Sequence, residues 1–138
     1  MAEWIRFSRG TQSGFGVIRD KEVISFSGDM FGKHEPDGEV FQLQDVNLEC
    51  PASKQALVLG MWNNFDAVRD KQGLPAPRHP WYFVKPPTCL IGPNRKIQQP
   101  SSYVGPVIYE AELAIIIGKY ASNVSVEFAG EYVFGYTA

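Results

Sequence analysis

The chain has 138 residues, the size of one ordinary domain, which is long enough to bury a hydrophobic core. It is 44% hydrophobic and 20% charged, as is typical of a soluble globular protein. The net charge of −2 gives no reason to expect a nucleic acid or an anionic membrane as a partner, and no apolar run approaches the ~20 residues of a membrane span.

The start of the chain and the cysteines point to a cytoplasmic protein. Residues 1–6 lack the basic region and following apolar region of a signal peptide. Cys50 and Cys89 are far apart and do not have a metal-binding spacing, so a reduced pair is favoured over a disulfide. His34 and His79 both lie near prolines in loop-like sequence, which favours ordinary histidines over zinc ligands.

The first fifty residues predict a β-meander of apolar strands joined by polar turns. The expected strands are residues 4–7, 14–18 and 22–26. Residues 27–38 predict a loop with Met30 and Phe31 as its apolar anchors. Further extended pieces are expected at residues 40–43 and 46–48. Thirteen glycines and ten prolines also favour a β-rich fold with short strands.

Residues 51–54 predict a linker, so we expect an N-terminal β-region over 1–50 and a second domain over 51–138. Residues 56–60 predict an apolar strand, and residues 66–72 are the best short helix candidate. Asp66 would be the N-cap of this helix or lie in its first turn, and Gly73 would end it. The aromatic run at 81–85 predicts a strand that two prolines stop.

Two glutamates precede an apolar run over residues 109–118. Ala-Ile-Ile-Ile followed by glycine predicts a buried strand. Side chains alternate along a strand, so Glu110 and Glu112 would share one face. Two carboxylates at the end of a buried strand repel unless a cation intervenes, and Mg²⁺, Mn²⁺ or Ca²⁺ would satisfy them. The alternative is a strand end that emerges into water with two solvated glutamates.

The end of the sequence predicts one more helical turn and one more strand. Residues 125–132 would form the turn with Ser125 as N-cap, and residues 133–137 would begin the strand. The sequence stops at Ala138 within this apolar strand. Since native termini usually lie in exposed segments, we expect an incomplete domain, a processed fragment or an unusual terminus.

The order of these motifs resembles that of the fumarylacetoacetate hydrolase family. The resembling phrases are residues 60–65, 81–87, 90–93, 109–119, 123–125 and 132–137. The resemblance implies a mainly β, α+β fold: an incomplete mixed β-sandwich roll with an N-terminal β-meander. It covers roughly residues 50–138, and the first fifty residues resemble the family's variable N-terminal region more loosely.

The resemblance also implies a chemistry. Family members hydrolyse, decarboxylate or isomerise oxo-acids from aromatic catabolism, with Mg²⁺ or Mn²⁺, or alternatively Ca²⁺, bound to the oxygens of a small oxo-acid substrate. Glu110 and Glu112 match two carboxylate ligands of this metal. Lys85 matches the lysine of the aromatic strand, where it would face an anionic substrate. The alternative for Lys85 is a surface lysine whose stem covers apolar groups.

Two departures from the family pattern lower the expected activity. The family's third metal ligand is an aspartate after the phrase at 132–137, and the sequence reaches only Ala138. The family's lid histidine is also missing, and Asp66 is the only substitute, although an N-cap role is favoured for it. We therefore expect metal binding to be weak or lost and the chain alone to be a poor catalyst.

Three functional readings remain open from the sequence. The first is the N-terminal portion of a metal-dependent hydrolase or isomerase. The second is a truncated, non-catalytic domain that acts as a structural or interaction module. The third is half of a split enzyme, in which a partner chain supplies the missing aspartate. A homodimer or a partner chain that completes the fold is expected, because bare strand edges need to be covered.

Overall fold

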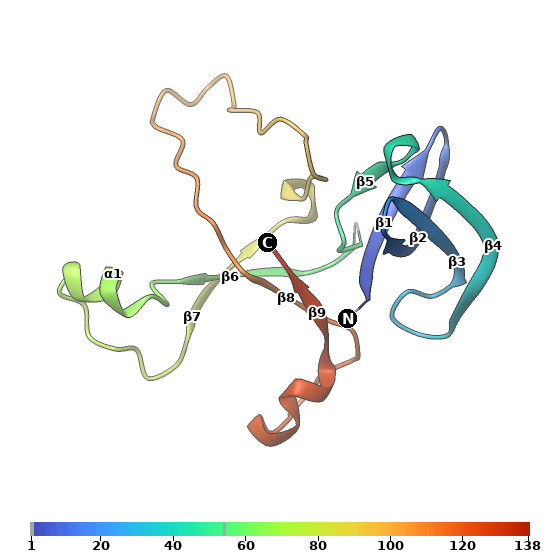
Figure 1. Ribbon diagram of the computed structural model, residues 1–138. Helices are drawn as coiled ribbons and strands as arrows, with labels where there is room; N and C mark the ends of the chain where they lie inside the picture. The colour runs from blue at the N-terminus through green and yellow to red at the C-terminus, as the bar shows by residue number, and fades with distance from the viewer. Residues whose placement is uncertain (1, 54) are drawn as a thin grey trace. The chain divides into compact units, whose positions relative to one another are not determined.

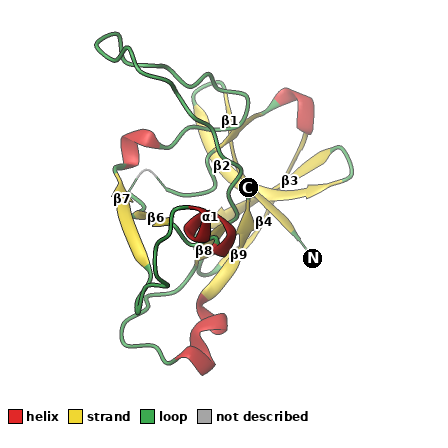
Figure 2. Cartoon of the chain, turned by 90° about the vertical axis from the view of Figure 1, so that its left-hand side faces the viewer, coloured by secondary structure: helices red, strands yellow, loops and turns green. Residues whose placement is uncertain are grey.

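The structure is a computed structural model that describes residues 2–53 and 55–138. The chain divides into two compact units: unit 1 comprises Met1–Pro51 and Gly92–Ala138, and unit 2 comprises Ala52–Ile91. Figures 1 and 2 show short strands, a few short helices and long loops, so the expected mainly β class is confirmed. No helix in the described ranges is long and apolar enough to cross a membrane.

An antiparallel five-stranded sheet forms the N-terminal part of unit 1, in the order β4-β3-β2-β1-β5. Its strands are β1 (Glu3–Arg9), β2 (Gln12–Arg19), β3 (Glu22–Gly28), β4 (His34–Gln42) and β5 (Asn47–Glu49), with the 3₁₀ turn η1 (Leu43–Asp45) before β5. The predicted meander is therefore confirmed. Gly10 and Asp20 lie in the tight turns with φ of 60° and 58°, a backbone region that favours glycine and tolerates aspartate.

The hydrophobic core lies on one face of this sheet. Phe7, Val23 and Val46 are its buried residues, at 5%, 0% and 9% exposure. The partly buried residues Ile5, Ile18, Phe41 and Leu43 pack against them. Gly16 in β2 has to be glycine, because a Cβ there would lie 2.3 Å from the Ile24 carbonyl oxygen.

The opposite face of the sheet carries a cluster of aromatic side chains. The Trp4 ring lies 5.0 Å from the Phe26 ring and 4.7 Å from the His34 ring, both edge-on, which is a favourable geometry. Phe134 of β9 (Val133–Thr137) joins this cluster, with ring centroids 6.2 Å from Trp4 and 4.8 Å from Phe31. The C-terminal strand thus packs on the N-terminal sheet within unit 1.

The region expected to be a loop, residues 27–38, is only partly irregular. Strand β4 begins at His34, so the prediction of a loop to Gly38 is wrong. Pro36 is tolerated because β4 is an edge strand and its register with β3 shifts between Ile24 and Phe26. The anchors were identified correctly: Met30 is 4% exposed, and Phe31 contacts the aromatic cluster.

Unit 2 is a two-stranded antiparallel sheet with one short helix between its strands. Strand β6 (Val58–Trp62) pairs with β7 (Trp81–Lys85), α1 spans Asp66–Lys71, and the 3₁₀ turn η2 (Pro87–Cys89) follows β7. Phe65 occupies the N-cap position and Asp66 lies in the first turn of α1, so the first-turn alternative for Asp66 is confirmed and its N-cap role is wrong. Gly73, with a φ of 66°, follows the helix as predicted.

The last part of unit 1 departs most from the sequence prediction. Strand β8 covers only Ala114–Ile117 and pairs with β9. Ile115 and Ile117 are 55% and 53% exposed, so the prediction of a buried strand is wrong for this chain. The 3₁₀ helix η3 (Val126–Tyr132) lies where a helical turn was expected, but its N-cap, Ser125, makes no capping hydrogen bond.

Candidate metal and substrate site

Glu110 and Glu112 lie in a segment without regular secondary structure, just before β8. Both residues are exposed, and no ion pair among the described residues involves either carboxylate. The prediction that they share one face of a strand is therefore wrong for the structure of this chain. Strand β8 begins at Ala114, which is the first residue that pairs with its partner strand β9. Their assignment as metal ligands stays a prediction.

The donor atoms fit a hard divalent cation in type but fall short in number. Carboxylate oxygens are the ligands that Mg²⁺ and Ca²⁺ prefer, and Mg²⁺ retains several waters. Within residues 2–53 and 55–138, however, no group of three or more His, Cys, Asp or Glu residues could hold a metal ion. Glu110 and Glu112 by themselves therefore do not form a complete metal centre in this chain.

Lys85 is the last residue of β7 and pairs with Val58 across the hairpin. It is exposed, and its Nζ lies 5.6 Å from the centroid of the Phe83 ring, a cation–π contact along the strand. The aromatic strand thus holds the ammonium group near an apolar surface. Lys85 belongs to unit 2 and the two glutamates belong to unit 1, and the proposed role of Lys85 toward a substrate stays a prediction.

Asp66 forms an ion pair within its own helix. The Arg69 Nη2 donates a hydrogen bond to the Asp66 Oδ1 at 2.5 Å. The Asp66 side chain is 81% exposed, whereas that of Arg69 is only 13% exposed. Asp66 is therefore available to solvent and also orients an arginine that is largely buried. Its role as a substitute for the lid histidine stays a prediction.

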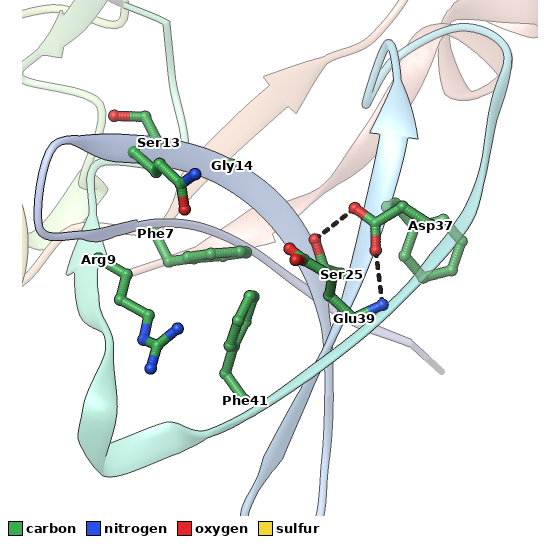
Figure 3. Close-up of a pocket in the computed structure, with 10 residues that line it drawn as sticks. Phe7, Arg9, Ser13, Gly14, Ser25, Asp37, Glu39 and Phe41 are labelled. Carbon is green, nitrogen blue, oxygen red and sulfur yellow. Dashed lines mark hydrogen bonds between the residues drawn. The ribbon is translucent and has the colours of Figure 1, made fainter.

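A hollow of about 290 Å³ lies beside the N-terminal sheet, and Figure 3 shows the side chains that line it. The buried Ser25 hydroxyl donates to the Asp37 Oδ2 at 2.7 Å, and the Glu39 backbone N–H donates to the Asp37 Oδ1 at 2.9 Å. The Arg9 guanidinium lies 5.1 Å from the Phe41 ring centroid. These contacts satisfy the buried hydroxyl and hold the β4 bulge, so we assign the hollow a structural role.

A second hollow, of about 300 Å³, lies within unit 2. Its lining includes Trp62, Trp81, Arg69 and Asp66. Sequence reasoning identified only Asp66 among these four. The available signal was Trp62, two residues after the strand predicted at 56–60, and Trp81, the first residue of the next predicted strand, because a hairpin between these strands places Trp62 opposite Trp81.

Two family models match successive parts of the chain. Residues 57–138 match the family model described as fumarylacetoacetate (FAA) hydrolase C-terminal, and residues 3–51 match the one described as Rv2993c-like, N-terminal. The chain is 36% identical to Protein Rv2993c of Mycobacterium tuberculosis over 107 residues, which cover 78% of this chain and 40% of that protein.

Two further relatives have named activities. Caffeoylpyruvate hydrolase of Neonothopanus nambi is 44% identical over 79 residues, covering 54% of this chain and 27% of that protein. The crystal structure of 5-carboxymethyl-2-hydroxymuconate delta-isomerase from Mycobacterium smegmatis superposes with a TM-score of 0.83 at 31% identity, covering 99% of this chain and 52% of that one. The chain spans about half the length of the solved structure and less of these curated relatives.

Proposed function

Because the chain belongs to the fumarylacetoacetate hydrolase family, we propose that it supplies part of the active site of a metal-dependent enzyme that hydrolyses, isomerises or decarboxylates a small oxo-acid. The observation that carries this proposal is the family match over 57–138, which includes Glu110 and Glu112. Both carboxylates are exposed and lack an ion-pair partner in the described chain, so they are available to a cation.

The proposed metal is Mg²⁺ or Mn²⁺, with Glu110 and Glu112 as two of its ligands. A bound divalent cation supplies a Lewis acid that polarises substrate oxygens. Lys85 is proposed to attract the anionic substrate through its ammonium group, and Asp66 is the candidate for proton transfer near the helix. We place the protein in the cytoplasm because Cys50 and Cys89 are both free, as in a reducing compartment.

The chain alone is proposed to be a poor catalyst. Two carboxylates leave the cation with few protein ligands, and the family's lid histidine has no counterpart in α1, whose sequence is Asp-Ala-Val-Arg-Asp-Lys. Loss of a supporting ligand commonly costs about 10-fold or more in affinity or activity, and loss of a general acid or base about 10²-fold or more. The remaining ligands would come from residues outside this stretch of sequence.

Metal binding tests the ligand assignment directly. We expect the purified chain to bind Mn²⁺ weakly, as measured by electron paramagnetic resonance of the free ion. Glu110→Ala and Glu112→Ala should each weaken binding about 10-fold or more. Glu127→Ala is the matched control, because Glu127 is an exposed carboxylate of the same unit. Equal Mn²⁺ binding by all four proteins would refute the assignment.

Turnover tests the proposed low activity. With Mg²⁺ or Mn²⁺ present, we expect hydrolysis of an acylpyruvate or tautomerisation of oxaloacetate to stay near the uncatalysed rate. Robust metal-dependent turnover that either glutamate substitution abolishes would contradict the low activity and would imply that another residue or a second copy completes the site. The metal-binding result is independent of this rate, so the two parts of the proposal can fail separately.

A second candidate function is that of a non-catalytic interaction module. It is favoured by the exposure of apolar side chains in and before β8, where Ile108 and Leu113 are 79% and 71% exposed. Exposed apolar patches of this kind mark surfaces that bind other proteins. Undetectable Mn²⁺ binding together with stable self-association would favour this function over the catalytic one.

A further inference from the structure

The hollow in unit 2 combines an aromatic wall with a cation. Trp62 and Trp81 face each other at the end of the β6–β7 hairpin, with ring centroids 5.4 Å apart and an interplanar angle of 32°. Met61, Pro77 and Pro80 add apolar lining. The volume of about 300 Å³ is at the lower end of the range for small-molecule pockets, so a small ligand fits best.

Both indole rings are exposed in the described part of the chain. Trp62 is 57% exposed and Trp81 is 36% exposed. Tryptophan brings the largest apolar area of any side chain, and exposed apolar area is a cost that a ligand can relieve. Because the rings are planar, an aromatic ring would cover more of this area than an aliphatic chain of equal size.

Arg69 gives the same hollow a positively charged donor. Its side chain is only 13% exposed, and its Nε is buried with no hydrogen-bond partner among the described residues. A guanidinium carries five N–H donors in a planar fork that matches a carboxylate. Asp66 uses one of these nitrogens, but the 81% exposure of Asp66 weakens that ion pair through solvent screening. The guanidinium therefore retains donors for a second, anionic partner.

We propose that this hollow binds a small aromatic acid, with its ring against Trp62 and Trp81 and its carboxylate at Arg69. The inference goes beyond the proposed function, because the ring and acid contacts lie within unit 2 and involve neither Glu110 nor Glu112. It requires no metal ion, since both interactions come from side chains of unit 2 alone. An aliphatic acid would keep only the ionic contact, and an uncharged aromatic compound only the ring contact.

The test uses 3-phenylpropionate, which carries the ring and the carboxylate but has no oxo group to chelate a metal. Trp4 is the only tryptophan outside the hollow, so Trp4→Phe restricts tryptophan emission to Trp62 and Trp81. We expect a saturable change in this emission, with half-saturation on the order of 1 mM, which is the weak affinity that a small ligand allows. Propionate and benzyl alcohol should each bind at least about 10-fold more weakly.

Substitutions of Arg69 and Trp62 test the carboxylate contact and the ring contact separately. Arg69→Gln should weaken binding of 3-phenylpropionate about 10-fold, while Arg69→Lys should weaken it less. Arg78→Gln is the matched control, because Arg78 is an exposed arginine of unit 2 outside the lining. Trp62→Ala should weaken binding about fivefold, measured by saturation-transfer NMR on the ligand ring so that the readout does not depend on the lost indole. Circular dichroism checks that each variant remains folded.

Several results would overturn the inference. One is the absence of a saturable response to 3-phenylpropionate by either method. The others are binding of propionate as tight as that of 3-phenylpropionate, and equal binding of 3-phenylpropionate by the Arg69→Gln and Arg78→Gln proteins. Repeating the titration with Glu110→Ala separates the two proposals. Binding that survives in this variant, whatever its effect on Mn²⁺, supports the aromatic-acid site independently of the metal site.

Discussion

The five-stranded sheet and the two short strand pairs differ in how much of their apolar surface they bury. The sheet buries Phe7, Val23 and Val46 on one face and gathers aromatic rings on the other. By contrast, no residue of β6, β7, β8 or β9 is fully buried. A two-stranded sheet is marginal in water, whereas three or more strands with an apolar face can be stable alone. The N-terminal sheet therefore carries most of the stability of this chain.

This contrast explains why the same kind of sequence behaves differently in the two regions. Val-Ile-Ser-Phe in β3 and Ala-Ile-Ile-Ile in β8 are both rich in apolar residues. The first lies between two neighbouring strands, β2 and β4, while the second pairs only with β9. Burial thus depends on how many strands and side chains pack beside each strand, which the local sequence does not determine.

Truncating a core side chain should destabilise the N-terminal sheet and leave the two-stranded β6–β7 pair unaffected. We expect Phe7→Ala to lower the free energy of unfolding by about 3 kcal/mol, because a buried aromatic leaves a cavity in the packed core. Leu59→Ala in β6 should cost less than about 1 kcal/mol, since Leu59 is 48% exposed. Urea denaturation followed by circular dichroism measures both. Equal losses would show that the two regions are equally well packed.

Gly16 in β2 and Gly135 in β9 differ in the space that surrounds the position of a Cβ. Gly16→Ala places a Cβ 2.3 Å from the Ile24 carbonyl oxygen, so the β2–β3 ladder must shift, at a cost of about 2 kcal/mol. A Cβ at Gly135 in β9 meets no atom within 4 Å, so Gly135→Ala should change stability by no more than about 0.5 kcal/mol. Thermal unfolding of both variants gives the measurement, and a larger loss from Gly135→Ala would contradict it.

Local patterns predicted most of the secondary structure. The meander, the helix at α1, the aromatic strand β7 and the strand β9 were all expected from alternation, turn residues and flanking prolines. The failures have identifiable physical causes. The first part of β4 was missed because Pro36 and Gly38 are typical of a loop, although an edge strand with a bulge tolerates both.

The candidate site was less predictable than the fold. Spacing placed Glu110 and Glu112 on one strand face, but β8 begins two residues after Glu112 because strand length depends on the partner β9. The burial of Arg69 was not visible in the sequence, since it depends on tertiary contacts within unit 2, whereas its pairing with Asp66 is a local contact between residues three apart in one helix. The family resemblance identified the matching residues, whereas their geometry required the structure.

The smallest expected effect concerns self-association through β8. Ile115 and Ile117 lie on one face of a strand, and both are more than half exposed. Burying such side chains against a second copy is favourable, and a lysine on this face would oppose contact through its charge. We expect Ile115→Lys to weaken association about fivefold in sedimentation equilibrium experiments. Val126→Lys is the matched control, because Val126 is 95% exposed but lies outside any strand. If the unmodified chain remains monomeric at high concentration, the exposed face of β8 does not bind a second copy. The N-terminal sheet and the short strand pairs then differ in stability alone.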